Sequence, residues 1–163
     1  MRVYIPATVP MLRTFVESGE LAPVTGTAFA LTPALRESYA AGDTEELEYS
    51  AMLDAARASL RLLAADEKAE PRRAVIAVDV DDVTLRPDLD FSVVKVAGSF
   101  TTKDVAAVHL DTAEAEQDVR AAADVIDAAD LGDPDAEFAL GSAEDHELAW
   151  YAAQELPFVL ELL

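Results

Sequence analysis

Two aspartates separated by a single residue, Asp79 and Asp81, directly follow the apolar run Val75–Val78. A short continuous apolar run of this kind predicts a buried strand, so the two carboxylates are expected where that strand leaves the sheet. Carboxylates are among the residue types that covalent catalysis and divalent-metal-assisted hydrolysis use. Asp79 and Asp81 are therefore candidate catalytic residues.

The ten residues Val75–Thr84 resemble the first motif of the haloacid-dehalogenase-type phosphatases. This resemblance implies a nucleophile at Asp79 and an acid/base at Asp81, with magnesium beside them. The segment departs from the motif at Asp82, where that family has glycine, and no lysine strand or late aspartate pair follows. A divalent-metal-dependent hydrolase is one interpretation, and a buried strand that runs out into an acidic loop is the simpler one.

A second acidic pattern begins at Asp133. Asp133, Asp135, Glu137 and Glu144 occupy positions 1, 3, 5 and 12 of an EF-hand-like loop, which is the spacing of oxygen ligands that calcium uses. Position 6 of such a loop requires glycine for a sharp turn, and Phe138 stands there. These four residues are candidate metal ligands for weak divalent-cation binding, and we expect no dedicated cofactor.

The two histidines of the chain differ in their surroundings. His146 lies among acidic residues in Glu144–Glu147, and a histidine flanked by carboxylates can be a metal ligand or a general base. His109 alternates with Val108 and Leu110, so it is predicted to point to the opposite face of a strand. We therefore keep His146 as a candidate catalytic residue, beside the simpler reading that its acidic neighbours are there by chance.

Acidic residues dominate the charge of the chain: 32 aspartates and glutamates stand against 12 lysines and arginines, for a formal net charge of −20. Such a surface repels phosphate groups, so we expect no nucleic-acid partner and no anionic membrane partner. The hydrophobic fraction of 52% supplies a core and excludes a disordered chain. Cysteine is absent, which excludes disulfides, thiolate metal sites and cysteine nucleophiles.

The first residues, Met1–Phe15, lack the apolar run and the cleavage site of a signal peptide. No apolar run in the chain reaches the 18 or so residues that predict a membrane-spanning helix. From these two observations we expect a cytoplasmic protein.

Strands and helices are predicted in a mixed order without strict alternation. Capping residues predict helix starts after Thr8, Thr32, Asp43 and Asp111, because their side chains can accept from free backbone amides. We expect strands at 2–5, 27–31, 72–80, 91–96, 105–110, 138–140 and 148–151, and helices at 9–18, 33–41, 44–65, 115–131 and 152–163. This order predicts one α+β domain over residues 1–163, with a mixed or mainly antiparallel sheet and helices packed on it.

Finer expectations concern three segments. Residues 81–90 are predicted to be a loop, and residues 98–104 a connection between two hairpin strands. In the longest helix, one buried face is expected because its apolar residues recur at helical spacing: Tyr49, Met52, Leu53, Ala56, Leu60 and Leu63.

Several segments spread along the chain look like one uncharacterised protein family of actinobacteria, a domain of unknown function. They are VYIPAT, GTAFALTPALRE, DTEELEY, DAARASLRLLAAD and DAEFALGSAEDHELAWYAAQELP. The similarity runs nearly end to end, which supports one domain. It implies no activity, cofactor or partner.

Three functions follow from these observations. The leading one is a non-catalytic acidic binding or regulatory protein, in which the segments Asp79–Asp90 and Asp133–Glu147 form an acidic rim that docks a basic protein partner. The first alternative is a divalent-metal-dependent hydrolase that uses Asp79, Asp81 and His146. The second is a structural homodimer.

The homodimer alternative depends on apolar residues near the end of the chain. Trp150, Phe158, Val159 and Leu160 are expected to be exposed and to form the seam between two copies.

Overall fold

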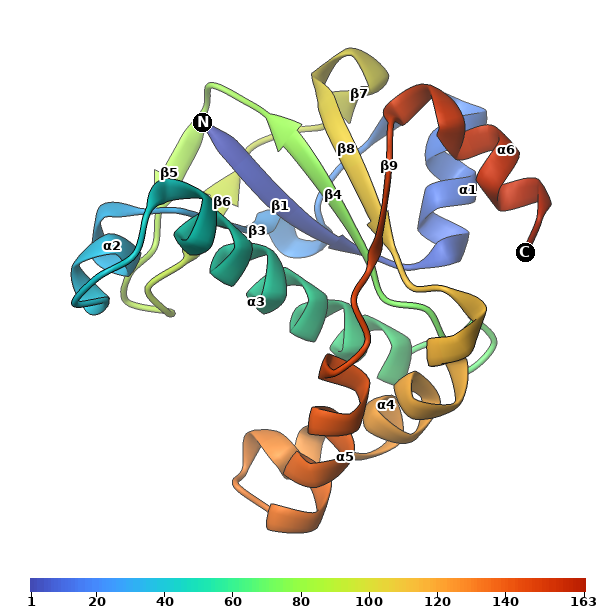
Figure 1. Ribbon diagram of the computed structural model, residues 1–163. Helices are drawn as coiled ribbons and strands as arrows, with labels where there is room; N and C mark the ends of the chain where they lie inside the picture. Colours follow the sequence, from blue (N-terminus) through green and yellow to red (C-terminus); the bar gives the residue numbers. More distant parts are fainter.

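The computed structural model describes residues 1–163 and contains a seven-stranded antiparallel sheet with helices on both faces (Figure 1). The order across the sheet is β5-β6-β3-β1-β4-β8-β9. The strands are β1 (Arg2–Ala7), β3 (Thr27–Ala30), β4 (Ala74–Asp79), β5 (Val83–Leu85), β6 (Val93–Val96), β8 (Val105–Leu110) and β9 (Ala149–Tyr151). Since every strand pair is antiparallel and the helices pack on the sheet, the α+β prediction is confirmed.

The helices form two layers and a hairpin. Helix α3 (Thr44–Ala64) crosses one face of the sheet, and α1 (Val9–Ser18) and α6 (Leu156–Glu161) cover the other face (Figure 1). Helix α4 (Glu116–Asp130) packs against the far end of α3, and α5 (Pro134–Glu144) packs on α4. The remaining elements are α2 (Pro33–Ser38), the small sheet of β2 (Glu20–Leu21) with β7 (Phe100–Thr101), and short 3-10 turns.

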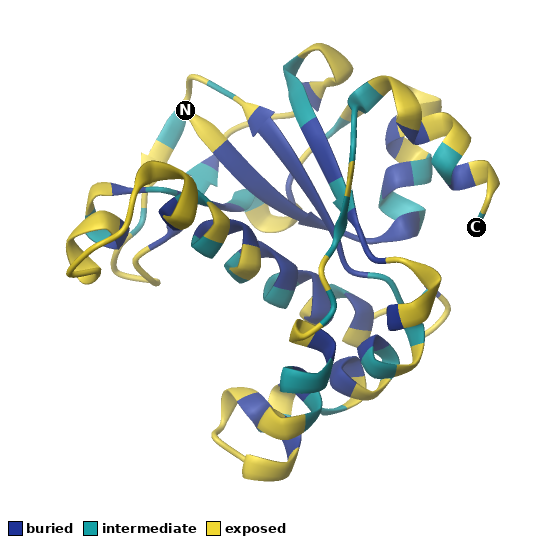
Figure 2. Ribbon diagram, viewed as in Figure 1, coloured by how far each residue is buried: buried dark blue, intermediate teal, exposed yellow.

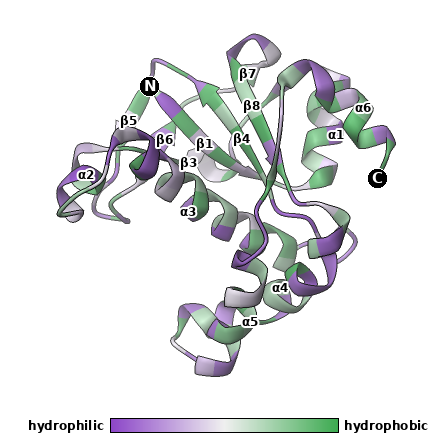
Figure 3. Cartoon of the chain, viewed as in Figure 1, coloured by the Kyte–Doolittle hydropathy of each residue, from purple (hydrophilic) through white to green (hydrophobic).

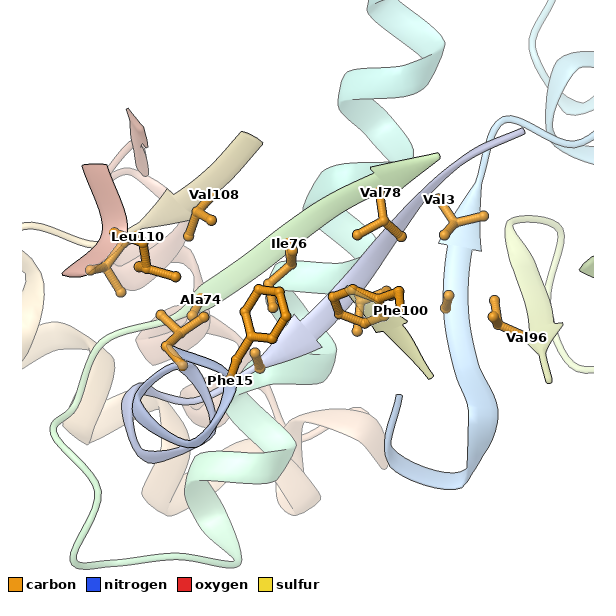
Figure 4. Packing of buried hydrophobic residues seen from close by; sticks show 14 of the residues in the cluster. Val3, Phe15, Ala74, Ile76, Val78, Val96, Phe100, Val108 and Leu110 are labelled. Carbon is orange, nitrogen blue, oxygen red and sulfur yellow. The ribbon is translucent and has the colours of Figure 1, made fainter. Parts of the chain in front are cut away.

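Side chains along the central strands point alternately to the two faces of the sheet, and each face has its own hydrophobic core. Val3 and Ile5 of β1 and Val108 of β8 point into the core beneath α1 and α6, where Phe15 and Phe100 meet edge to face with ring centroids 5.3 Å apart (Figure 4). The residues that alternate with these along the strands, such as Tyr4, point toward α3. Because β1 and β4 lie in the middle of the sheet, they are buried along nearly all of their length, whereas β9 at the edge is not (Figure 2).

Three helices begin at the capping residues that the sequence indicates. The side chains of Thr8, Thr32 and Asp43 accept hydrogen bonds from the backbone amides of Met11, Leu35 and Glu46. Each of these bonds satisfies one of the free amides of a helix start. These three cap predictions are confirmed, although α2 ends at Ser38 rather than at the expected residue 41. The cap predicted at Asp111 is wrong, because its carboxylate accepts from Arg73 and the turn and helix that follow have no side-chain cap.

Helix α3 buries most of the face that its apolar spacing predicts, since Met52, Ala56, Leu60 and Leu63 are buried, but the centre of that face is shifted toward its small residues. Its buried stripe includes Ala51, Ala55 and Ser59, whereas Tyr49 and Leu53 are 48% and 38% exposed. Small side chains let the helix approach the strands closely, so the alanine stripe takes the inner position and Tyr49 lies at its margin. The expectation that Tyr49 and Leu53 are buried is therefore wrong.

Three local predictions are also wrong. Residues 138–140, expected as a strand, lie inside α5, because Asp133 caps that helix and Pro134 occupies its first turn. Residues 83–85 form the edge strand β5 within the expected loop. Residues 98–104 do not join a hairpin, since β6 pairs with β3 and β5 whereas β8 pairs with β4 and β9.

An ion pair is buried where β4 begins and β8 ends. Arg73 donates through Nε and Nη2 to the carboxylate of Asp111, each at 2.8 Å, and the two side chains are 1% and 0% exposed. Arg73 Nη2 also donates to the backbone carbonyl of His146 at 2.8 Å. The pair therefore fixes the segment between α5 and β9 to the sheet.

The hydropathy of the chain follows this arrangement. Strands β4 and β8 are mainly hydrophobic, and the segment that joins α5 to β9 is mainly hydrophilic (Figure 3). None of the helices combines the length and the apolar composition that are needed to cross a lipid bilayer.

Candidate functional site

A pocket of about 380 Å³ lies on the α3 side of the sheet, between the first half of α3 and the edge strand β9. Figure 1 shows the elements that supply its lining, with α3 across one face of the sheet and β8 and β9 at the sheet's edge. Its lining residues come from four parts of the chain that are distant in sequence: Tyr4, Glu45, Glu48, Tyr49, Met52, His109, Glu147, Leu148 and Trp150.

Strand register explains how these residues meet. His109 of β8 lies directly opposite Trp150 of β9, so both side chains are on the α3 face of the sheet. Tyr4 reaches the same face from β1, where its neighbour across the strands is Ala77 and then Ala107.

The walls of the pocket are acidic, and Arg2, the arginine whose charge acts on Tyr4 and Glu48, lies outside the lining in a pair with Asp79. Glu45 and Glu48 come from α3 and Glu147 from the segment before β9, and no lysine or arginine lines the pocket. His109 does not compensate this charge, because its burial lowers the pKa of the imidazole below the ordinary value of 6.5. The pocket therefore carries negative charge near neutral pH.

One hydrogen bond ties the floor of the pocket to its wall. The hydroxyl of Tyr4 donates to Oε2 of Glu48 at 3.1 Å. Burial and the neighbouring charge of Glu48 raise the pKa of Tyr4 to about 12, so the phenol keeps its proton. Glu48 is thus held in place as an acceptor, while Glu45 and Glu147 are exposed.

Aromatic rings border the same carboxylates. Trp150 is 60% exposed and Tyr49 is 48% exposed, and they belong to the β9 wall and the α3 wall respectively. The faces of such rings attract cations, above all those of tryptophan. Rings and carboxylates together make a surface that suits an organic cation.

The aspartates of the hydrolase hypothesis do not lie in this pocket. Asp79 ends β4 and forms a two-point ion pair with Arg2, with both bonds at 3.1 Å, and that hydrogen bonding lowers the pKa of Asp79. Asp81 is exposed in the next turn. No three acidic or histidine side chains of the chain gather closely enough to hold a metal ion.

The four EF-hand-like residues lie along a helix instead of around a loop. Asp133 accepts from the amides of Asp135 and Ala136 as the cap of α5, and Glu137 lies in the first turn. Glu144 is the last residue of the same helix, 3.9 Å from Arg57. At 1.5 Å per residue, the helix separates Asp133 from Glu144 by about 16 Å, so the two do not converge on one ion.

His146 also has a structural position. Its Nε2 lies 2.8 Å from Oδ2 of Asp118 on α4, and its carbonyl accepts from Arg73. His146 thus fixes the segment before β9 and stays apart from Asp79 and Asp81. His109, which the alternation of β8 directs away from Val108 and Leu110, is the histidine that lines the pocket.

A comparison with protein families matches residues 1–160 to DUF6912, a family of unknown function. The chain belongs to this family. No curated protein and no solved structure matches it. The match confirms the resemblance to an uncharacterised family over nearly the whole chain.

A second cleft of this DUF6912 protein, of about 430 Å³, lies between α3, the turn before β6 and the start of α5. It brings the two acidic segments of the expected rim together at Asp90 and Glu137. Arginines are present here, however: Arg57 and Arg61 both donate to Asp130, and this hydrogen bonding lowers the pKa of Asp130. The charge of this cleft is thus partly neutralised within the protein.

The four apolar residues of the expected dimer seam are divided between two faces. Trp150 lies on the α3 face, whereas Phe158, which is 69% exposed, lies on α6 across the sheet. Leu160 is 8% exposed, and Val159 packs against the core. These residues do not form one apolar surface in the DUF6912 chain.

Proposed function

We propose that this DUF6912 protein is a non-catalytic binding protein that docks a basic protein partner at the pocket between α3 and β9. The observation that carries the proposal is the lining of the pocket, in which Glu45, Glu48 and Glu147 have no lysine or arginine among them. Carboxylates confined to one pocket repel one another, and a cation of the partner relieves that repulsion.

The charge of the remaining surface supports the same conclusion. Most arginines already pair with carboxylates of the chain, as Arg2 does with Asp79 and Arg86 with Asp88. Most of the 32 acidic side chains are left without such a partner. A surface of this kind attracts a basic protein over a distance, and the pocket gives the encounter a specific place.

The proposal is tested by calorimetry with a defined probe, a capped peptide that contains both lysine and arginine. The pocket variant Glu45→Gln/Glu48→Gln/Glu147→Gln removes three charges and retains the shape of the side chains. The control variant Glu17→Gln/Glu37→Gln/Glu161→Gln removes three exposed charges outside the pocket, none of which forms an ion pair.

We expect the pocket variant to bind the peptide about tenfold more weakly than the wild type, which corresponds to about 1.4 kcal/mol. The control variant should lose no more than about twofold, because distant exposed charges are screened by salt. Equal losses in the two variants would show diffuse attraction with no docking site. No binding by the wild type at low salt would overturn the proposed function itself.

A further inference from the structure

We infer that the pocket between α3 and β9 receives an arginine side chain of the basic partner, with its guanidinium against Trp150 and between the glutamates. This inference rests on the proposed function and adds to it the residue type that is recognised.

The first reason is the combination of flat rings and carboxylates. A guanidinium is planar and weakly hydrated, so it stacks on an aromatic face while its N–H groups donate in the plane to carboxylates. Trp150 offers an exposed ring on one wall, and Glu45 and Glu147 offer exposed carboxylates near it. A cation without N–H donors would leave those carboxylates without a hydrogen bond.

The second reason is the apolar part of the lining. Met52 and Leu148 line the pocket together with the glutamates, and Met52 is 5% exposed. The three methylene groups of an arginine can lie against such apolar side chains while the head group stays beside the carboxylates. A lysine ammonium keeps a strongly bound water shell, so it gains less from the exposed ring.

The third reason is that no lysine or arginine of the protein lines the pocket. Arg2 is close enough for its charge to act on Tyr4 and Glu48, but its guanidinium is held by Asp79 through two hydrogen bonds of 3.1 Å. His109 stays neutral near pH 7 because burial lowers its pKa. The pocket is therefore open to an arginine from outside.

The sequence provides a direct reporter, because Trp150 is the single tryptophan of the chain. Its fluorescence can be followed as one short capped peptide is added in three forms that carry arginine, lysine or citrulline at the same position. Citrulline keeps the shape of arginine and removes its charge. Binding is measured in wild type and in the charge variant Glu45→Gln/Glu147→Gln.

We expect the arginine peptide to change the fluorescence of Trp150 saturably and to bind at least about threefold more tightly than the lysine peptide. The citrulline peptide should not bind measurably. Glu45→Gln/Glu147→Gln should weaken the arginine peptide about tenfold. In calorimetry, Trp150→Leu should remove the preference for arginine over lysine, whereas Phe138→Leu, at a 79% exposed aromatic residue outside the pocket, should keep it.

Equal affinities for the arginine and lysine peptides, both weakened in the charge variant, would overturn this inference and leave the proposed function standing. Binding of citrulline as tight as that of arginine would overturn the inference as well, because charge would then play no part. If neither charged peptide binds, both the inference and the proposed function are wrong.

Discussion

Tyr4 on the central strand donates a hydrogen bond of 3.1 Å to Glu48 on the helix that covers it. This contact joins residues 44 positions apart and sets the inner margin of the acidic pocket. Because burial and the charge of Glu48 both raise the pKa of Tyr4, the titration of this phenol reports on the environment of the pocket.

Tyr4 should titrate near pH 12, well above the ordinary tyrosine value of 10. Because the pKa is higher in the folded protein, the stability that this proton provides is present below pH 10 and is lost as the pH rises toward 12. An absorbance titration of phenolate should therefore lose its highest-pH step in Tyr4→Phe. A highest step that persists in Tyr4→Phe would assign the raised pKa to another tyrosine.

The substitution Tyr4→Phe should also lower the free energy of unfolding by about 1 kcal/mol, because Glu48 loses its donor.

The buried ion pair of Arg73 and Asp111 should be sensitive to removal of one partner. Arg73→Met or Asp111→Leu should each lower the free energy of unfolding by about 3–5 kcal/mol, since the other charge is left buried and unpaired. Denaturant unfolding of the double variant Arg73→Met/Asp111→Leu should show a much smaller loss than the sum of the two. Additive losses would show that the two charges act independently, against the 2.8 Å contacts.

The cap of α5 distinguishes a helix from a calcium loop. Asp133→Ala should lower the free energy of unfolding by about 1 kcal/mol, because the amides of Asp135 and Ala136 lose their acceptor. The loss should be the same with a chelator as with millimolar Ca²⁺. A loss that appears with Ca²⁺ alone would mean that Asp133 binds the ion, in conflict with its position at a helix start.

His109 should make the protein less stable at mildly acidic pH. Its pKa is lowered by burial, so the unfolded chain takes up the proton first and stability falls as the pH drops below about 6.5. The free energy of unfolding of His109→Gln, measured across this range, should fall less steeply than that of the wild type. A nuclear magnetic resonance titration that gives His109 a pKa above 6.5 would contradict the burial of this ring.

Local signals along the sequence were sufficient for much of the fold. Thr8, Thr32 and Asp43 cap helices as predicted, because capping depends on only the few residues that follow. Asp133 caps α5 in the same way, but the apolar residues 138–140 that follow it by themselves favour a strand. Competing local signals of this kind are decided by packing, here of α5 against α4.

The pocket could not be predicted in the same way. Tyr4, Glu48, His109 and Trp150 come together only because β1, β4, β8 and β9 are neighbours in that order, and spacing in the sequence does not give strand order. The aspartates with the sharpest local spacing, Asp79 and Asp81, lie at the end of β4, where Asp79 pairs with Arg2. Within the sequence, one local pattern indicates a residue of the pocket: His109 alternates with Val108 and Leu110, so it points to the opposite face of β8.

The most direct test of the binding site is a nuclear magnetic resonance titration of the labelled protein with the capped basic peptide at low and physiological salt. We predict that the largest shifts at both salt concentrations fall on the backbone amides of Glu45–Met52, His109 and Glu147–Trp150, which line the pocket. They should be absent in the pocket variant Glu45→Gln/Glu48→Gln/Glu147→Gln. Shifts spread over acidic residues of α4 and α5 that vanish at physiological salt would contradict a docking site between α3 and β9.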